Sequence, residues 1–390
     1  MRVDHLAERL HSITPFYVMA ILRRAKELEA LGHSIIHMEI GEPDFPTPPL
    51  IIEAGIACLQ SGQVKYTPAA GLPALRRNIA EFYQQRYAVT VAPERVFVTP
   101  GASGALLLAL GLTLNPKDTV LMTDPCYPCN ANFVSLLNAN AFAMPVTAAT
   151  HYQLTPELID DCWHPGVKGV LMASPSNPTG TIIPPQQFQH CIDAVQRNGG
   201  YFYSDEIYHG LVYGSAAMTA LTWSDQVFVL NSFSKYFGMT GWRVGWLIVP
   251  EAFIEAAEKL AQNIFIAAPT HSQVAALAAF EPATIAELEA RRRQCSERLD
   301  YLYDGLCRLG FTVPIKPEGA FYVYANCAAF TDNSYQFALD LLETEGVAIT
   351  PGIDFGRYRA NEMVRFAYTL PIDAMREALV RIERFITRGH

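Results

Sequence analysis

The chain has 390 residues, of which half are apolar and 17% are charged, so it can bury a large core and is expected to divide into two lobes. Its formal net charge of −9 argues against nucleic acid and against an anionic membrane surface as principal partners. The longest apolar run, residues 105–114, is too short to span a bilayer, which argues against a membrane protein.

The first fifty residues predict a helix, a short strand and a rigid connection. Apolar residues recur at helical spacing from Val18 to Leu28, and Gly32 provides a stop. Residues 34–40 then predict a short strand. The prolines of residues 41–49 forbid regular structure, so we place the first boundary between the lobes in this segment.

From about residue 50 the pattern changes to short apolar strands separated by amphipathic helices. This alternation predicts an α/β fold whose mostly parallel sheet is covered by helices on both faces. In such sheets the loops at the carboxyl ends of the strands carry the ligand site. The seven expected strands are residues 96–99, 120–123, 141–146, 169–173, 201–204, 227–230 and 244–249.

The C-terminal part predicts a smaller α+β lobe. A long helical stretch, about residues 272–309, leads out of the sheet region. The elements expected after it are strands at 321–325 and 363–368 and helices at 334–345 and 373–386. We therefore expect a large domain of residues 46–280 and a small domain that both chain ends form, residues 1–45 and 281–390.

The most informative segment follows the sixth expected strand. Residues 231–246 read Asn-Ser-Phe-Ser-Lys-Tyr-Phe-Gly-Met-Thr-Gly-Trp-Arg-Val-Gly-Trp. Lys235 stands there at the end of a buried strand, with a second cation, Arg243, nearby. Burial and a neighbouring cation both disfavour the ammonium form, which makes a lysine amine a nucleophile able to form a Schiff base. In isolation, a loop lysine is far more often a surface charge.

This segment resembles the cofactor-attachment segment of the class I and II pyridoxal-phosphate-dependent aminotransferases, the aspartate aminotransferase superfamily of fold type I. The resemblance is carried by Ser-x-Ser-Lys followed by Met-x-Gly-x-Arg-x-Gly-Trp, and it extends in the family's order from about residue 13 to 385. It implies pyridoxal 5'-phosphate as the cofactor, bound to Lys235 as a Schiff base. It also implies a seven-stranded, mostly parallel sheet between helices with a smaller α+β lobe.

A glycine turn between the first expected strand and an apolar helix predicts a site for the cofactor's phosphate. Backbone N–H groups at a helix start have no partner within the helix and bind anions. Alone, the sequence Gly-Ala-Ser-Gly is weak evidence for a phosphate site, but Arg243 adds the cationic fork that suits a phosphate dianion. The residues assigned to the phosphate are Gly101, Ala102, Ser103, Ser232, Ser234 and Arg243.

Pyridoxal chemistry needs a carboxylate against the pyridine nitrogen, so that the ring accepts electrons. Asp205 follows the fifth expected strand, where an acid is more often a helix cap. However, Asp-x-x-Tyr before Ser-Lys resembles the family motif, which implies that Asp205 holds the ring nitrogen and Tyr208 donates to the phenolic oxygen. The resemblance also gives Asn177, in Asn-Pro-x-Gly, a contact to this oxygen. Tyr127 falls where the family stacks an aromatic, often a different one, on the ring.

The substrate's carboxylate needs a cationic partner. Arg365 lies among apolar neighbours in an expected strand, where an unpaired charge is costly. The resemblance implies that Arg365 clamps this carboxylate, together with Asn177 and the backbone of Gly41. Tyr66 resembles the tyrosine that reaches the phosphate of the neighbouring subunit, which implies a homodimer with shared active sites. No metal site is expected.

The resemblance implies a ping-pong transfer of the amino group of an L-amino acid to a 2-oxo acid, with Lys235, Asp205 and Tyr208 as catalytic residues. An alternative is a C–S lyase or a synthase of the same fold. A transcription regulator with an effector domain of this kind is a further alternative, but it needs an N-terminal DNA-binding module for which the pattern leaves no room.

The side chain of the substrate is less constrained. Phe16, Tyr17 and Tyr127 indicate a pocket with aromatic walls, which suits neutral or aromatic substrates. No second arginine or lysine can be assigned to a distal carboxylate from the sequence.

The eight cysteines have no regular spacing, which suits a reducing compartment better than a disulfide framework. Cys126 and Cys129 have the C-x-x-C form but lack a second pair, so we expect core or pocket-wall residues. The N-terminus shows no apolar segment ahead of a cleavage site, so no signal peptide is expected. A cytoplasmic protein is therefore predicted.

Overall fold

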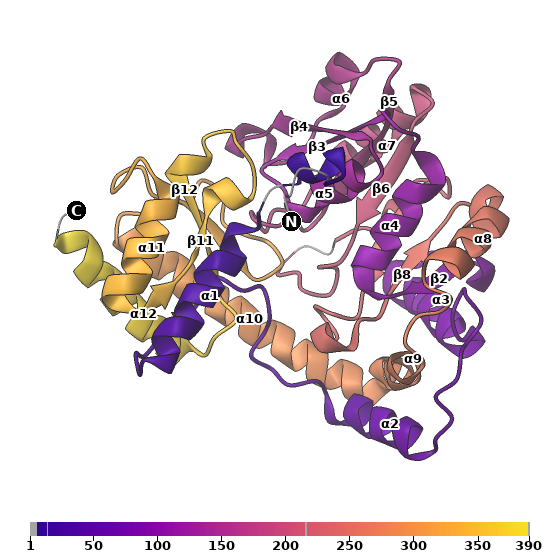
Figure 1. The fold of residues 1–390 in the computed structure, drawn as a ribbon, viewed down its shortest axis with the longest axis horizontal. Helices are drawn as coiled ribbons and strands as arrows, with labels where there is room; N and C mark the ends of the chain where they lie inside the picture. The colour runs from indigo at the N-terminus through magenta and orange to yellow at the C-terminus, as the bar shows by residue number, and fades with distance from the viewer. Residues whose placement is uncertain (1–5, 14, 215–216, 389–390) are drawn as a thin grey trace.

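The structure is a computed structural model that describes residues 6–13, 15–214 and 217–388. Figure 1 shows two groups of elements, a large sheet with its helices and a smaller group formed by an N-terminal helix and the C-terminal part of the described chain. A long helix runs along one side of both groups (Figure 1). Residues 1–5, part of the region for which no signal peptide is expected, lie outside the described residues.

The large sheet consists of seven strands of the described chain. These strands are β2 Val96–Thr99, β3 Thr119–Asp124, β4 Asn140–Pro145, β5 Val167–Ala173, β6 Tyr201–Asp205, β7 Phe228–Ser232 and β8 Gly245–Ile248. They lie in the order β2-β8-β7-β6-β5-β3-β4. Only β8 is antiparallel to its neighbours, β2 and β7, and all other pairs are parallel. The α/β class and the mostly parallel seven-stranded sheet are thus confirmed.

Helices cover both faces of this sheet. The helices of this group are α2 Pro49–Gln60, α3 Pro73–Tyr87, α4 Gly101–Thr113, α5 Cys129–Leu136, α6 Pro156–Cys162, α7 Pro185–Arg197, α8 Ile254–Ile264 and α9 Thr270–Leu277, of which α2 packs on α9 and α6 on α7. Because side chains alternate along a strand, Val96 and Val98 of β2 belong to one hydrophobic cluster and Phe97 to another. Residues of α4 and α8 pack in the cluster of Phe97, and residues of α3, α7 and α9 pack in the other.

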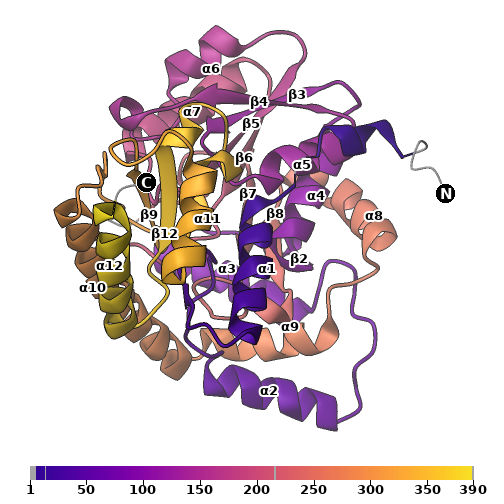
Figure 2. The same cartoon turned by 60° about the vertical axis from the view of Figure 1, so that its left-hand side comes forward.

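The smaller group contains an antiparallel sheet in the order β11-β12-β9 and a parallel pair of β1 with β10. Helix α1 packs beside α11 (Figure 2), so the N-terminal segment completes this group. The domain boundaries at residues 46 and 281 stay a prediction. The elements are α1 Tyr17–Ala30, β1 Ile36–His37, α10 Pro282–Arg308, β9 Tyr322–Asn326, α11 Ser334–Glu345, β10 Val347–Ala348, β11 Thr350–Pro351, β12 Met363–Ala367 and α12 Ile372–Thr387.

Two expected elements differ in extent. The helical stretch of residues 272–309 is not continuous, because α9 ends at Leu277 and α10 begins at Pro282. A proline has no N–H to donate and restricts the residue before it, and Glu281 is accordingly extended, with φ −62° and ψ 139°. The strand of residues 34–40 is reduced to Ile36–His37, although Met38 continues the hydrogen bonding through its backbone.

Candidate active site

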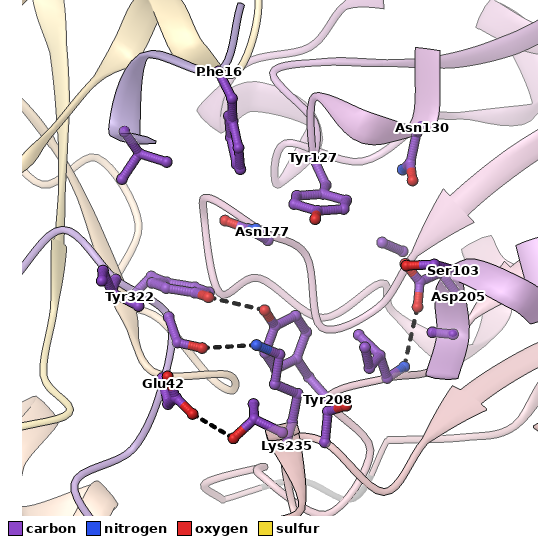
Figure 3. A pocket seen from close by; sticks show the side chains of 18 of the residues that line it. Phe16, Glu42, Ser103, Tyr127, Asn130, Asn177, Asp205, Tyr208, Lys235 and Tyr322 are labelled. Carbon is purple, nitrogen blue, oxygen red and sulfur yellow. Dashed lines mark hydrogen bonds between the residues drawn. The ribbon is translucent and has the colours of Figure 1, made fainter. Parts of the chain in front are cut away.

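A cavity of about 440 Å³ lies at the carboxyl ends of the strands of the large sheet. Ala173 ends β5, Asp205 ends β6 and Lys235 follows β7, so three neighbouring strands deliver residues to one place. The opposite wall comes from α1, the segment after β1, and strands β9 and β12. Figure 3 shows labelled side chains from both groups pointing toward the same space. A cavity of this size is typical of a small-molecule site.

Lys235 lies between the two groups of elements. Its Nζ donates a hydrogen bond to the carbonyl of Gly41, at 2.7 Å (Figure 3). Burial, together with the nearby cations Arg365 and Arg243, lowers the pKa of the Lys235 ammonium to about 8, although the carboxylates of Glu42 and Asp205 oppose this shift. A substantial fraction of this amine is therefore neutral near physiological pH, as a nucleophile requires.

Of the two adjacent acids at the end of β6, only Asp205 faces the cavity. Its Oδ1 accepts a hydrogen bond from the backbone N–H of Ile207 at 3.1 Å, and burial raises the pKa of its carboxyl to about 6. Glu206 points away, where its Oε1 accepts hydrogen bonds from Ser204, Thr219 and the backbone of Ala220. A carboxylate enclosed like Asp205 is stabilised by a cationic partner in the cavity.

The start of α4 forms an anion cradle. Gly101 has φ +71°, and a Cβ at this position would collide with the guanidinium of Arg243. Nη1 of Arg243 donates to Oγ of Ser234 at 3.4 Å, and Oγ of Ser232 donates to the same Oγ at 2.9 Å. Ser103 lines the cavity from the first turn of the helix. Unpaired N–H groups, hydroxyls and a guanidinium thus converge, which is the environment that binds phosphate.

Arg365 is a buried arginine held in a fixed position on β12. Nη1 donates to Oδ1 of Asn177 at 2.8 Å, and Nη2 donates to the carbonyl of Glu39 at 2.5 Å and to Oγ1 of Thr350 at 3.1 Å. Its Nε is buried and has no hydrogen-bond partner among the described residues, and no described carboxylate forms an ion pair with its guanidinium. The guanidinium lies 4.1 Å from the ring centroid of Tyr322. A buried cation without an anion favours a ligand carboxylate.

Two pairs of aromatic residues complete the walls. Oη of Tyr208 and Oη of Tyr322 are 2.9 Å apart and share a hydrogen bond (Figure 3). The rings of Phe16 and Tyr127 meet edge to face with centroids 6.2 Å apart. These contacts fix the Tyr208 hydroxyl beside Lys235 and place the Tyr127 ring over the cavity (Figure 3).

The family described as aminotransferase class I and II matches residues 33–382 of the chain. The chain belongs to this family. It is 39% identical over 381 residues to a valine–pyruvate aminotransferase from Mycobacterium tuberculosis, covering 97% of this chain and 98% of that one. It is 36% identical over 386 residues to a (5-formylfuran-3-yl)methyl phosphate transaminase from Methanocaldococcus jannaschii, covering 98% and 100%. The crystal structure of an aminotransferase from Mycobacterium tuberculosis is similar with a TM-score of 0.95 at 38% identity, covering 99% and 100%.

The protein is therefore a pyridoxal-phosphate-dependent aminotransferase that exchanges an amino group between an amino acid and a 2-oxo acid. The family, the fold type and the activity inferred from residues 231–246 are confirmed. The named relatives are transaminases, and the lyase or synthase alternative has no support among them.

The cavity of this aminotransferase fits the cofactor. The cradle at Gly101 suits the phosphate because only a glycine lets Arg243 approach the helix start. Asp205 offers a buried carboxylate for a cationic ring nitrogen, and Lys235 offers an amine of lowered pKa for the aldehyde. The phosphate, the pyridinium and the aldehyde of pyridoxal phosphate therefore each find a complementary group in the cavity.

Two residues expected at the site, Ser232 and Tyr17, do not line the cavity, and Tyr66 stays a prediction because its expected place is the neighbouring subunit's phosphate site. Tyr66 is 82% exposed and does not line the cavity of the single chain. Ser232 is buried behind Ser234 and reaches the cavity only through it. Tyr17 was expected to form an aromatic wall and does not line the cavity: its ring packs against Tyr335 of α11, 5.4 Å away. Phe16 precedes α1 with an extended backbone, φ −89° and ψ 102°, and of these two aromatic residues only Phe16 lines the cavity.

The structure also brings residues to the site that sequence reasoning missed. Oγ1 of Thr240 donates to Oε1 of Glu42 at 2.5 Å, and both line the cavity. Tyr322 lines it from β9. The sequence could have indicated Tyr322, because the hydroxyl of a tyrosine in an expected buried strand needs a hydrogen-bond partner. Further cavity residues without a sequence signal are Val18, Met19, Leu22, Ile40, Leu106, Asn130, Phe133 and Ile207.

Cys126 and Cys129 are both unpaired thiols and do not line the cavity. Within the described ranges there is no cluster of three or more His, Cys, Asp or Glu side chains that could hold a metal ion. No helix formed by these residues is long and apolar enough to cross a membrane.

Proposed function

We propose that this aminotransferase acts on amino acids with neutral, largely apolar side chains. The observation that carries this proposal is the use of the cations in the cavity. Lys235, Arg243 and Arg365 are the only Lys or Arg residues that line it in the described part of the chain, and the amine, phosphate and α-carboxylate assignments occupy all three. No described cation is left for a carboxylate on the substrate's side chain.

The cavity wall formed by α1 supports the same conclusion. Phe16, Val18, Met19 and Leu22 line the cavity on this side and present apolar surface. Glu42 adds a negative charge that repels an acidic side chain. A relative of this chain is named for valine and pyruvate, a neutral amino acid and a neutral-side-chain 2-oxo acid.

A substrate panel tests this proposal. Valine, leucine, methionine and phenylalanine should give higher kcat/KM than aspartate and glutamate, with pyruvate as amino acceptor. An unpaired buried carboxylate costs at least several kcal/mol, so the expected preference is of order 10³-fold or more. Production of the matching 2-oxo acid would be measured. Equal or higher kcat/KM for aspartate would contradict a neutral side-chain pocket.

We propose roles for the site residues from the family motifs that they match and from their places in the cavity. Bound pyridoxal phosphate supplies an electron sink that acidifies the α-hydrogen of the amino acid. Asp205 keeps the ring nitrogen protonated, while Tyr208 and Asn177 hold the phenolic oxygen. Lys235, once its amine is free and neutral, accepts the α-proton of the amino acid. It then donates this proton to the aldehyde carbon of the cofactor.

The same proposal gives the anion sites one ligand each. Gly101, Ala102, Ser103, Ser234 and Arg243 hold the phosphate, with Ser232 orienting Ser234. Arg365, Asn177 and the Gly41 backbone bind the carboxylate that amino acid and 2-oxo acid share. This common group explains how a single cavity serves both half-reactions of a ping-pong mechanism.

The substitution Arg365→Lys tests the carboxylate clamp. Lysine keeps the charge but loses the planar fork. Loss of one or two charge-assisted hydrogen bonds, at about 1.5–3 kcal/mol each, lowers kcat/KM at least roughly tenfold. KM should rise for amino acid and 2-oxo acid together, while the absorbance of bound cofactor stays unchanged.

Arg359→Lys is the matched control for this variant. Arg359 is exposed and paired with Glu362 at 2.5 Å, so its replacement should leave both KM values unchanged. If Arg365→Lys left both KM values unchanged, the clamp assignment would be wrong.

We also propose a cytoplasmic homodimer in which Tyr66 of each subunit reaches the partner's phosphate site. The support is exposed apolar surface in the segment that ends at Tyr66, since Ile56, Leu59 and Val64 are more than 40% exposed. The free thiols of all eight cysteines support a reducing compartment. Sedimentation of the holoenzyme should show two chains and cell fractionation should recover it with cytosolic markers. A fully active monomer would contradict shared sites.

A further inference from the structure

Tyr322 occupies a junction between three parts of the site. Its hydroxyl is 2.9 Å from the hydroxyl of Tyr208, and its ring lies 4.1 Å below the guanidinium of Arg365. The backbone of Gly41, which accepts the Lys235 hydrogen bond, passes so close that a Cβ there would collide with the Tyr322 hydroxyl. Tyr322 thus contacts the groups assigned to the cofactor oxygen, the substrate carboxylate and the lysine.

The two phenols can share their hydrogen bond in two directions. Burial raises the pKa of both hydroxyls, so each carries its single proton at ordinary pH. If Tyr208 gives its proton to the cofactor's phenolic oxygen, the proton between the two phenols must come from Tyr322. If Tyr208 instead donates to Tyr322, it has no proton left for the cofactor.

We propose that Tyr322 is a positioning residue with two separable functions: its hydroxyl donates to Tyr208 and so directs the Tyr208 proton to the cofactor oxygen, and its ring supports the Arg365 guanidinium. This proposal rests on the role proposed above for Tyr208. The supporting geometry is the hydrogen bond between the hydroxyls of Tyr322 and Tyr208, because the Tyr208 hydroxyl lies in the cavity beside Lys235 (Figure 3). A donor bonded to the back of Tyr208 polarises its O–H and strengthens the next hydrogen bond in the chain.

Tyr322→Phe removes the hydroxyl and keeps the ring. The measurement is the pH midpoint of the absorbance change of the bound cofactor in the holoenzyme. A hydrogen bond to the phenolic oxygen stabilises the deprotonated chromophore, so a weaker donor raises this midpoint. A charge-assisted bond that is strengthened by roughly 10–30% corresponds to an upward shift of about 0.1–0.7 pH unit. An unchanged or lowered midpoint would overturn the proposed direction of donation.

The ring function is tested by steady-state kinetics. Tyr322→Phe keeps the ring face under Arg365, so KM for amino acid and 2-oxo acid should not change while kcat falls. Tyr322→Leu removes the ring as well, and loss of a cation–π contact should raise both KM values about 2- to 30-fold. Equal KM values for the two variants would overturn the ring function.

Two further variants separate this proposal from the proposed function. Tyr208→Phe should raise the midpoint by more than Tyr322→Phe does, and adding Tyr322→Phe to it should cause no further shift. If Tyr208→Phe causes no shift, the role of Tyr208 fails. If only Tyr208→Phe causes a shift, the role of Tyr322 alone fails. Tyr203→Phe is the control, because this buried hydroxyl bonds to Thr113 at 2.6 Å and should leave midpoint and kinetics unchanged.

Discussion

Lys235→Ala should abolish transamination and the covalent attachment of the cofactor. Borohydride should link pyridoxal phosphate to residue 235 of the wild-type protein and to no residue of the variant, as peptide mass spectrometry would show. Loss of a positioned proton-transfer group costs roughly 10²–10⁴-fold. The total loss should be larger, because the same amine also holds the cofactor.

Lys259→Ala is the control for this experiment. Lys259 is an exposed residue of α8, and its replacement should leave both trapping and turnover unchanged. Trapping of the cofactor on any lysine other than Lys235 would end the assignment of the attachment site.

The lowered pKa of Lys235 also predicts how cofactor attachment depends on pH. The cofactor-free protein should take up pyridoxal phosphate faster as the pH rises through about 8, because only the neutral amine attacks an aldehyde. Below that value the ammonium form dominates and the rate should fall about tenfold per pH unit. Stopped-flow absorbance of reconstitution measures this rate. A profile with a midpoint near 10 would show that neither burial nor the two arginines affect the amine.

Asp205→Ala should separate cofactor binding from catalysis. The variant keeps Lys235 and Arg243, so the bound cofactor should remain visible by absorbance. Without the carboxylate the ring nitrogen loses its proton and the electron sink weakens. The loss of one fixed electrostatic partner at a reacting group costs roughly 10²–10³-fold in kcat. Single-turnover ketoacid formation measures the loss.

Glu206→Gln provides the comparison for Asp205→Ala. Burial raises the pKa of the Glu206 carboxyl to about 8, so it is mostly protonated at pH 7 and an amide of the same shape replaces it closely. Its turnover should remain within a few-fold of the wild type. Near wild-type turnover of Asp205→Ala would mean that this carboxylate only caps the turn at Ile207.

The sequence by itself determined the elements of the large sheet and singled out Lys235 as the lysine that we propose to react. Strands buried on both faces are short continuous apolar runs, and a run of this kind is visible without any partner. The Lys235 segment is informative for a different reason: the proposed cofactor attachment, phosphate binding and close backbone approach all fall within residues 231–246. Local requirements of this kind leave a local pattern.

Contacts between distant segments were decided only by the tertiary structure. Arg365 meets Asn177 across 188 residues of chain, and Tyr208 meets Tyr322 across 114. No periodicity records such a distance, because the partner is set by which strand ends the topology brings together. The sequence alone could name Arg365 as a costly buried charge, but not the hydroxyl and carbonyls that hold its fork in place.

The pocket for the substrate's side chain also depends on tertiary contacts that the sequence does not reveal. The sequence predicts an aromatic wall from Phe16 and Tyr17 alike, but only Phe16 lines the cavity. Phe16 has an extended backbone just before α1, whereas Tyr17 begins the helix and packs on Tyr335, so the docking of α1 on α11 sets the direction of both side chains. The local pattern therefore predicted an aromatic wall, and the docking of α1 decided which residue builds it.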